Sequence, residues 1–174
     1  MTKTASILAV PAVALLAAAA FAQSAGLQVR EAMIEGVNPA ALAIWEVTNA
    51  AMDDQGALDP AVMDEEAWSK VAEAARQLQF HSRRMAEAEA IVAGGPDLVS
   101  GELPPGVASR EEIQAMIDAD PAGFRAVAAE MAEQSGALLA AARARDPEAA
   151  GDLAFGIDAA CQSCHVRYWY LQAE

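Results

Sequence analysis

The sequence predicts an all-α protein, an antiparallel four-helix bundle that follows an N-terminal signal peptide. Three observations support this prediction. Helix-forming residues dominate the 174-residue chain, and apolar residues recur at spacings of three and four without a convincing strand-like alternation. Segments rich in Gly, Pro, Asn and Asp divide the chain into four helical blocks joined mostly by short connections. An antiparallel bundle is the architecture that this pattern favours.

The first 22 residues have the composition of a cleaved signal peptide. Lys3 gives a short positive region, an apolar run of about 14 residues follows, and an Ala-Phe-Ala tripeptide ends at Ala22. Because a membrane helix needs roughly 20 apolar residues, cleavage after Ala22 is favoured over a retained anchor. We therefore expect removal of residues 1–22, one domain over residues 23–174, and a periplasmic mature protein without a membrane span.

The charge of the mature chain narrows the choice of partner. Lys3 is the only charged residue of the signal peptide, which leaves 10 basic and 25 acidic residues and a formal charge of −15. This acid excess argues against nucleic acid or an anionic membrane surface as a partner. It favours a basic redox partner, although an acidic surface also simply keeps a protein soluble. We interpret the acidic residues as solvated helix faces. No set of residues in the sequence resembles a nucleophile–base pair or a paired-carboxylate site, so an electron carrier is predicted and not an enzyme.

The first two helical blocks are separated by a loop that ends at Pro60. The first block runs from about Leu27 to Met52, and Asn38-Pro39 should kink or restart it because Pro39 lacks an N–H and crowds the preceding turn. Its expected apolar face comprises Val29, Met33, Val37, Leu42, Trp45 and Val47. The second block starts after Asp64, a good N-cap residue, and is expected to end at Gly94-Gly95-Pro96. Its expected stripe comprises Trp68, Val71, Ala75, Leu78, Ser82 and Met85.

The last two blocks carry clear start signals. The third opens at Ser109 with a capping-box pattern, restarts at Asp120-Pro121 with Asp as N-cap and Pro in the first turn, and runs to about Arg145. The fourth repeats this start at Asp146-Pro147. Residues 96–108 read as a loop. The expected apolar faces are Phe124, Val127, Met131, Leu138 and Ala142 in the third block, and Leu153, Ile157, Cys161, Cys164 and Tyr168 in the fourth.

The chemistry is concentrated in the fourth block, in Cys161-Gln162-Ser163-Cys164-His165. The pattern C-x-x-C-H is the attachment signature of a c-type haem. The two thiols add across the two haem vinyl groups, and the imidazole that follows ligates the iron. On a helix, Cys161, Cys164 and His165 project from one side, so that one turn can hold the macrocycle and its proximal ligand.

Other uses of the cysteine pair fit less well. A thioredoxin-like redox pair is expected beside a βαβ pattern, and a structural zinc site needs four ligands, whereas the sequence offers only one further histidine, His81. A local disulfide in a haem-free helical interaction module is the remaining alternative. We predict one covalent haem c, with thioethers at Cys161 and Cys164 and with His165 as the proximal iron ligand.

A signal peptide, four helices, the C-x-x-C-H motif on the last helix and almost no tail together resemble the class II cytochromes c, the cytochrome c′ family. The resemblance spans essentially the whole mature chain. Softer likenesses are residues 29–39 followed by Ala43-Ile44-Trp45, and residues 168–170 just after the haem histidine. The resemblance implies a four-helix bundle and a homodimer that forms through the first two helices.

The resemblance also places the first helix across the distal face of the haem. Family members with an apolar residue there have five-coordinate iron and bind NO and CO, whereas members with a methionine are low-spin electron carriers. By analogy this chain offers Met33 or Ile34. Met33 as sixth ligand predicts a one-electron carrier; Ile34 over an open iron predicts a gas-binding protein.

Three further assignments stay open at this point. Met33 can also be an ordinary core methionine that fills a gap between helices. His81 is the weakest candidate for the sixth ligand, because it lies on the second helix. Arg30, one turn from Met33, is a candidate partner for a haem propionate, and a solvated arginine is the alternative.

Overall fold

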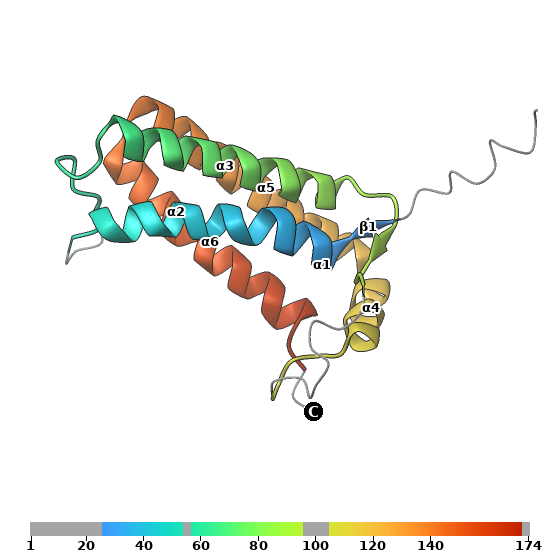
Figure 1. The fold of residues 1–174 in the computed structure, drawn as a ribbon. Coiled ribbons are helices and arrows are strands. Elements are labelled where there is room, and N and C mark those ends of the chain that lie inside the picture. Colours follow the sequence, from blue (N-terminus) through green and yellow to red (C-terminus); the bar gives the residue numbers. More distant parts are fainter. Residues whose placement is uncertain (1–25, 54–56, 96–104, 172–174) are drawn as a thin grey trace, which may run out of the picture.

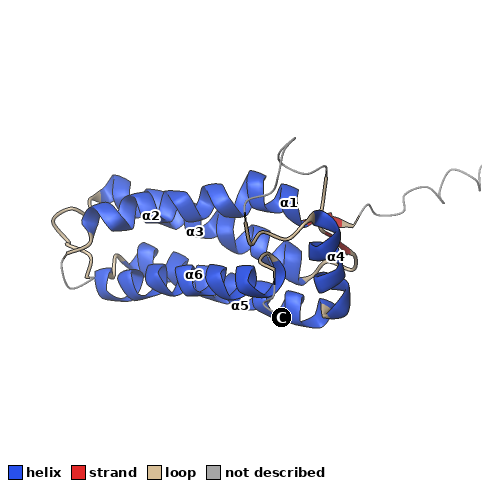
Figure 2. Ribbon diagram, turned by 90° about the horizontal axis from the view of Figure 1, so that it is seen from below, coloured by secondary structure: helices blue, strands red, loops and turns tan. Residues whose placement is uncertain are grey.

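The computed structural model describes residues 26–53, 57–95 and 105–171, so the predicted signal peptide lies outside the described residues. Consecutive long helices run in opposite directions (Figure 1). Seen from below, α2 and α3 form one row and α6 and α5 the other (Figure 2). These helices are α2 (Asn38–Ala51), α3 (Glu65–Ala86), α5 (Pro121–Ala144) and α6 (Pro147–Tyr168). The predicted four-helix bundle is confirmed.

The predicted helix starts are confirmed as side-chain caps. Asp64, Asp120 and Asp146 each accept a hydrogen bond from the backbone N–H three residues further on, at 2.8, 2.9 and 3.1 Å respectively. Ser109 and Glu112 form a reciprocal capping box at the start of α4 (Arg110–Ala119), a short helix at one end of the bundle. Each cap satisfies backbone donors that the first helical turn leaves unpaired.

The first helical block contains a wide turn. It consists of α1 (Val29–Ala32), the π-helical turn η1 (Met33–Val37) and α2. Pro39 explains the wide turn, because it has no N–H to donate to the carbonyl four residues earlier. The N–H of Asn38 instead bonds to the carbonyl of Met33, five residues back. The predicted restart at Asn38-Pro39 is confirmed, and the extra residue in the turn rotates α1 by about 100° relative to an unbroken α-helix.

The predicted apolar face of the first block is wrong at Leu42 alone, since Val37 is buried and Val29, Met33, Trp45 and Val47 are partly buried against the core. Leu42 was expected in the core and is 55% exposed, whereas Ile44 is fully buried. The buried face of α2 includes small residues, to which hydrophobic patterning gives little weight; its members are Ala40, Ala41, Ile44, Thr48 and Ala51. The predicted stripe of α3 is confirmed in full, since Trp68, Val71, Ala75, Leu78, Ser82 and Met85 are all buried.

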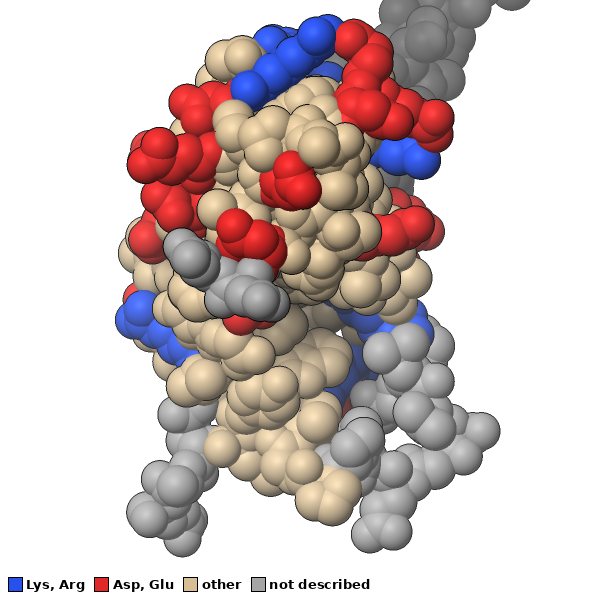
Figure 3. Space-filling view, turned by 90° about the vertical axis from the view of Figure 1, so that its left-hand side faces the viewer, with Lys and Arg blue, Asp and Glu red and all other residues tan. Residues whose placement is uncertain are grey.

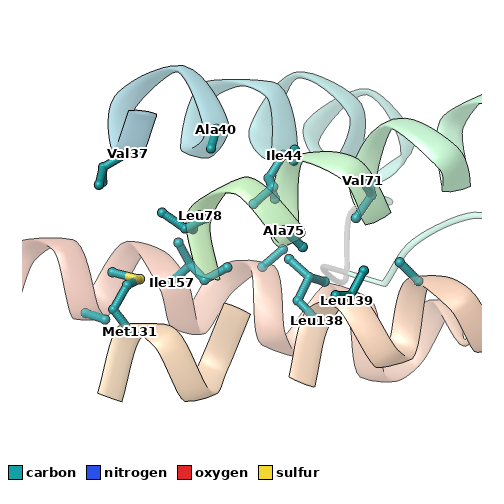
Figure 4. Packing of buried hydrophobic residues seen from close by; sticks show 14 of the residues in the cluster. Val37, Ala40, Ile44, Val71, Ala75, Leu78, Met131, Leu138, Leu139 and Ile157 are labelled. Atoms are coloured by element: carbon teal, nitrogen blue, oxygen red, sulfur yellow. The ribbon is translucent and has the colours of Figure 1, made fainter. Parts of the chain in front are cut away.

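The core lies between the four long helices. Each of them contributes at least one fully buried aliphatic side chain: Ile44 of α2, Val71 and Leu78 of α3, Leu138 of α5 and Ile157 of α6 (Figure 4). These side chains interlock with several alanines, which lets the helices approach closely. At roughly 25 cal/mol per Å² of apolar surface removed from water, this cluster supplies the main drive for the fold.

Helix α3 ends earlier than predicted, at Ala86 and not at the Gly94-Gly95 pair. Residues 87–95 leave the bundle, and their strand β2 (Ile91–Val92) pairs in parallel with β1 (Leu27–Gln28) just before α1. Arg125 of α5 holds the start of this segment by donating to two of its carbonyls, each at 2.9 Å. Strands of two residues are too short for a period-two pattern, so the sequence carried no signal for them.

Two remaining expectations concern the loop and the membrane. Of the predicted loop at 96–108, residues 105–108 are described, and they are not helical. Among the described residues, no helix combines the length and the apolar character that crossing a bilayer requires.

Candidate haem site

Helices α2 and α6 contact each other much less than the other neighbouring pairs of long helices do. Two cavities open between the start of the first helical block and the end of α6. The first, of about 330 Å³, is lined by Met33 and Ile34 together with Cys164 and His165. The second, of about 280 Å³, is lined by Met33, Cys161, Cys164 and His165. Met33 and His165 therefore border both cavities, and the structure brings the predicted distal and proximal residues together.

The predicted attachment residues share one side of α6. Cys161, Cys164 and His165 are partly buried, while the two intervening residues, Gln162 and Ser163, are exposed. This arrangement follows from the helical spacing of three and four residues. Both cysteines are free thiols in the structure, which leaves them available for a thioether to a cofactor.

Burial sets the protonation state of these three side chains. It raises the pKa of each thiol to about 11, with a further contribution from Asp158 at Cys161 and from Cys161 at Cys164. Burial lowers the pKa of His165 below its ordinary value. The imidazole of His165 is therefore neutral at pH 7, and neutral imidazole is the form that binds a metal.

Aromatic and aliphatic side chains form the walls of the first cavity. Phe124 and Tyr168 meet edge to face, with ring centroids 5.3 Å apart, and the Tyr168 hydroxyl lies 3.3 Å from a carboxylate oxygen of Asp120. Ile113 and Ile117 reach the same cavity from α4. Sequence reasoning did not assign them to the site, because only their apolar spacing on a short helix marked them. Walls of this kind suit a large, flat, mostly apolar ligand.

Arg30 brings a positive charge to the wall of the first cavity. Its Nε is buried and has no hydrogen-bond partner among the described residues. Its backbone N–H donates to the carbonyl of Ala93 at 3.1 Å. Gly94, with φ at +108°, lies so close that an added Cβ would be 2.8 Å from the Arg30 Cβ. A guanidinium held in this way, with an unpaired buried donor, fits an anionic group in the cavity, and a haem propionate is such a group.

The residues present thus fit a covalent haem. Two free thiols and a neutral imidazole project from one helix turn, and apolar walls surround the space beside them. A cationic donor that finds no partner among the described residues borders the same space. His81 is not part of this arrangement. It lines neither cavity, and its ring packs on the backbone of Gly36. The structure therefore does not support His81 as an iron ligand.

Comparison with known proteins gives one finding. The family model described as Cytochrome C' matches residues 47–169, more than two thirds of the chain. The match includes Cys161, Cys164 and His165 but begins after Arg30, Met33 and Ile34. No curated protein and no solved structure matches the chain.

Proposed function

The chain belongs to the cytochrome c′ family and is a haem-binding c-type cytochrome, and on that premise we propose that it is a one-electron carrier whose iron is ligated by His165 and Met33. The observation that carries this proposal is the position of Met33. Its side chain borders both cavities together with His165, although the two residues come from opposite ends of the mature chain. A thioether and an imidazole are a ligand pair that favours electron transfer.

Each residue of the site has a distinct part in this proposal. Cys161 and Cys164 anchor the haem through thioethers, and His165 is the proximal ligand. The bound haem supplies the one-electron chemistry of its iron. Arg30 pairs with a propionate, which satisfies the buried Nε that has no hydrogen-bond partner in the described part of the chain. The aromatic and aliphatic walls keep water away from the ligands.

Ile34 is the weaker candidate for the distal position. Its side chain is 45% exposed and borders only the first cavity. Met33 is half-buried, packs against the hydrophobic core and borders both cavities. A gas-binding protein with Ile34 above an open iron is therefore an outcome of the test below, and not the function that the geometry favours.

The location and the partners belong to the same proposal. Members of the family are typically periplasmic, and the signal-like residues 1–22 support export to that compartment. A basic redox partner is supported by the acid excess; on the end of the molecule shown in Figure 3, acidic side chains spread over the upper part and basic ones sit in small groups near the margins. A homodimer through α2 and α3 is supported by the exposed side chains of Leu42 and Phe80 on these helices.

The experiment compares Met33→Ala with Ile34→Ala in the mature holoprotein. The wild-type protein should retain its haem through acid–acetone extraction and show, when reduced, a sharp low-spin α band that changes little with CO. Met33→Ala should give a broad high-spin spectrum that shifts when CO is added, because it removes the sixth ligand. Ile34→Ala, the neighbouring control, should keep the low-spin spectrum.

Three results would count against the proposal. An unchanged low-spin spectrum in Met33→Ala means that Met33 only packs in the core. A high-spin wild-type protein that binds CO moves the function to gas binding. A colourless mature protein, produced alongside a competent haem-maturation system, rejects both cytochrome functions for this chain.

A further inference from the structure

The π turn that carries Met33 is in close contact with a histidine of the neighbouring helix. His81 of α3 places the Cγ–Nδ1–Cε1 edge of its ring against Gly36, so closely that a Cβ added to Gly36 would lie 2.3 Å from Nδ1 and Cε1. Real side chains do not approach to this distance. The ring therefore occupies the space in which any other residue at position 36 would place its side chain, and the contact requires glycine there.

Gly36 and Met33 belong to the same five-residue turn, η1, but face different neighbours. Gly36 is buried against α3, whereas Met33 borders the cavities that Cys164 and His165 line. The ring of His81 thus contacts the same turn from which Met33 reaches the cavities. Since a π turn contains one residue more than an α turn, a return to α geometry would rotate Met33 by about 100° about the helix axis.

The ring acts through its shape. The Nδ1 atom of His81 is buried and has no hydrogen-bond partner among the described residues. Burial and, to a smaller extent, Arg84 lower the pKa of His81, while Glu35 of the π turn opposes them with the smallest contribution, so that the ring is neutral at pH 7. Among the described residues no hydrogen bond or ion pair joins the ring to the π turn. The close contact between them is steric, between the ring and the bare backbone of Gly36.

We propose that His81 is a positioning residue for the distal ligand: its ring holds the π turn at Gly36 and thereby keeps Met33 directed into the haem cavities. This inference rests on the proposed function, because it gives His81 a role only where Met33 ligates the iron. Pro39 disfavours α-helical geometry in the turn before it, because it has no N–H to donate. The contact with His81 of α3 then sets the direction in which this π turn places the side chain of Met33.

The test uses mature holoprotein variants and measures the low-spin band, the reduction potential and CO binding. His81→Ala should lose part of the low-spin band, lower the potential and gain CO binding, because the turn no longer holds Met33 in place. His81→Phe should resemble the wild type, since it keeps a planar ring against Gly36. Gly36→Ala should act like His81→Ala, because its methyl group displaces the ring, and the double variant should recover towards the wild type.

Gly136→Ala is the matched control. Gly136 lies inside α5 and also packs against α3, where an added Cβ would meet the Gln79 amide nitrogen at 2.3 Å. The end of the flexible Gln79 side chain can move aside, and Gly136 lines neither cavity. This variant should leave the spectrum, the potential and CO binding unchanged, whatever it does to the melting temperature.

The outcomes separate this inference from the proposed function. If Met33→Ala becomes high-spin while His81→Ala and Gly36→Ala keep the wild-type spectrum, potential and CO response, the positioning role is wrong and the function stands. If Met33→Ala itself remains low-spin, Met33 is not the sixth ligand, and both the proposed ligand pair and the positioning role of His81 are overturned. Equal changes in Gly136→Ala would also overturn the inference, since they would show a general effect of packing on α3. Where His81→Ala does not accumulate, Gly36→Ala and the double variant decide.

Discussion

Replacing Ile44 by alanine should destabilise the protein far more than the same replacement at Leu42, although the two residues are only two positions apart on α2. The structure points Ile44 into the core, where it is fully buried, and leaves the side chain of Leu42 more than half exposed. Hydrophobic patterning alone predicts the reverse, with Leu42 on the apolar face. The pair therefore tests how α2 is rotated about its own axis. This rotation matters for the site, because the π turn that carries Met33 leads directly into α2.

The expected magnitudes follow from the burial. An Ile→Ala change in a close-packed core removes three carbon atoms and leaves a cavity, at a cost of about 3 kcal/mol. For a domain of this size, that corresponds to a fall in melting temperature of roughly 6–12 °C. A change at an exposed helix position such as Leu42 costs at most about 0.5 kcal/mol.

Urea unfolding of the mature holoproteins, followed by far-UV circular dichroism, measures both free energies of unfolding. A covalent haem stays attached in the folded and the unfolded state, so it does not dissociate during the titration. The denaturant slopes must agree between variants for the comparison to hold. Equal costs, or a larger cost at Leu42, would refute the rotational setting of α2. A cost at Leu42 that depends on protein concentration would show that a second copy covers this side chain.

Three further predictions concern other parts of the site. Arg30→Met should lower the reduction potential, because it leaves an anionic group at the cavity wall unpaired. Arg30→Lys should lower the potential less, since it keeps the positive charge, and unchanged potentials in both variants would contradict the contact between Arg30 and a haem propionate. Gly94→Ala should lower the free energy of unfolding in urea more than Gly106→Ala does. Both residues have positive φ, which costs an alanine about 1–2 kcal/mol, but only at Gly94 would the added Cβ also clash with Arg30. Equal costs would contradict this packing. Asp120→Asn should lower the melting temperature at pH 7, and this difference should shrink as the pH falls below 3.8. The reason is that the backbone N–H of Gly123 lowers the pKa of Asp120 in the folded state, so the stabilisation is lost as the carboxylate becomes protonated. A difference that does not vary with pH would contradict a stabilising role of the ionised cap.

The helix starts were predictable because their signals are local. An Asp or Ser that caps its own helix needs no distant partner, and each of the four predicted caps forms its hydrogen bond within three residues. The stripe of α3 was predictable for a similar reason, since large apolar residues at helical spacing leave little choice of face. The attachment motif is local as well, because its spacing alone places three side chains on one side of a helix turn.

The features that the sequence did not predict depend on contacts between distant segments. Pro39 marked a break, but nothing in the sequence marked the close contact between Gly36 and the ring of His81 on α3. The face of α2 was wrong at Leu42 because alanines, which patterning underweights, pack against α3. The end of α3 was wrong because residues 87–95 are held by β1 and by Arg125, not by any signal of their own.

The central claim is that Met33 ligates the haem iron, and methyl NMR of the reduced holoprotein tests it most directly. The chain beyond residue 22 contains six methionines, and a methyl group next to the iron lies within the ring current of the macrocycle, which shifts its resonance strongly upfield. We predict one such resonance among the methionine methyl signals and its disappearance in Met33→Ala. Six methyl signals in the ordinary range, or a shifted signal that persists in Met33→Ala, would contradict the claim.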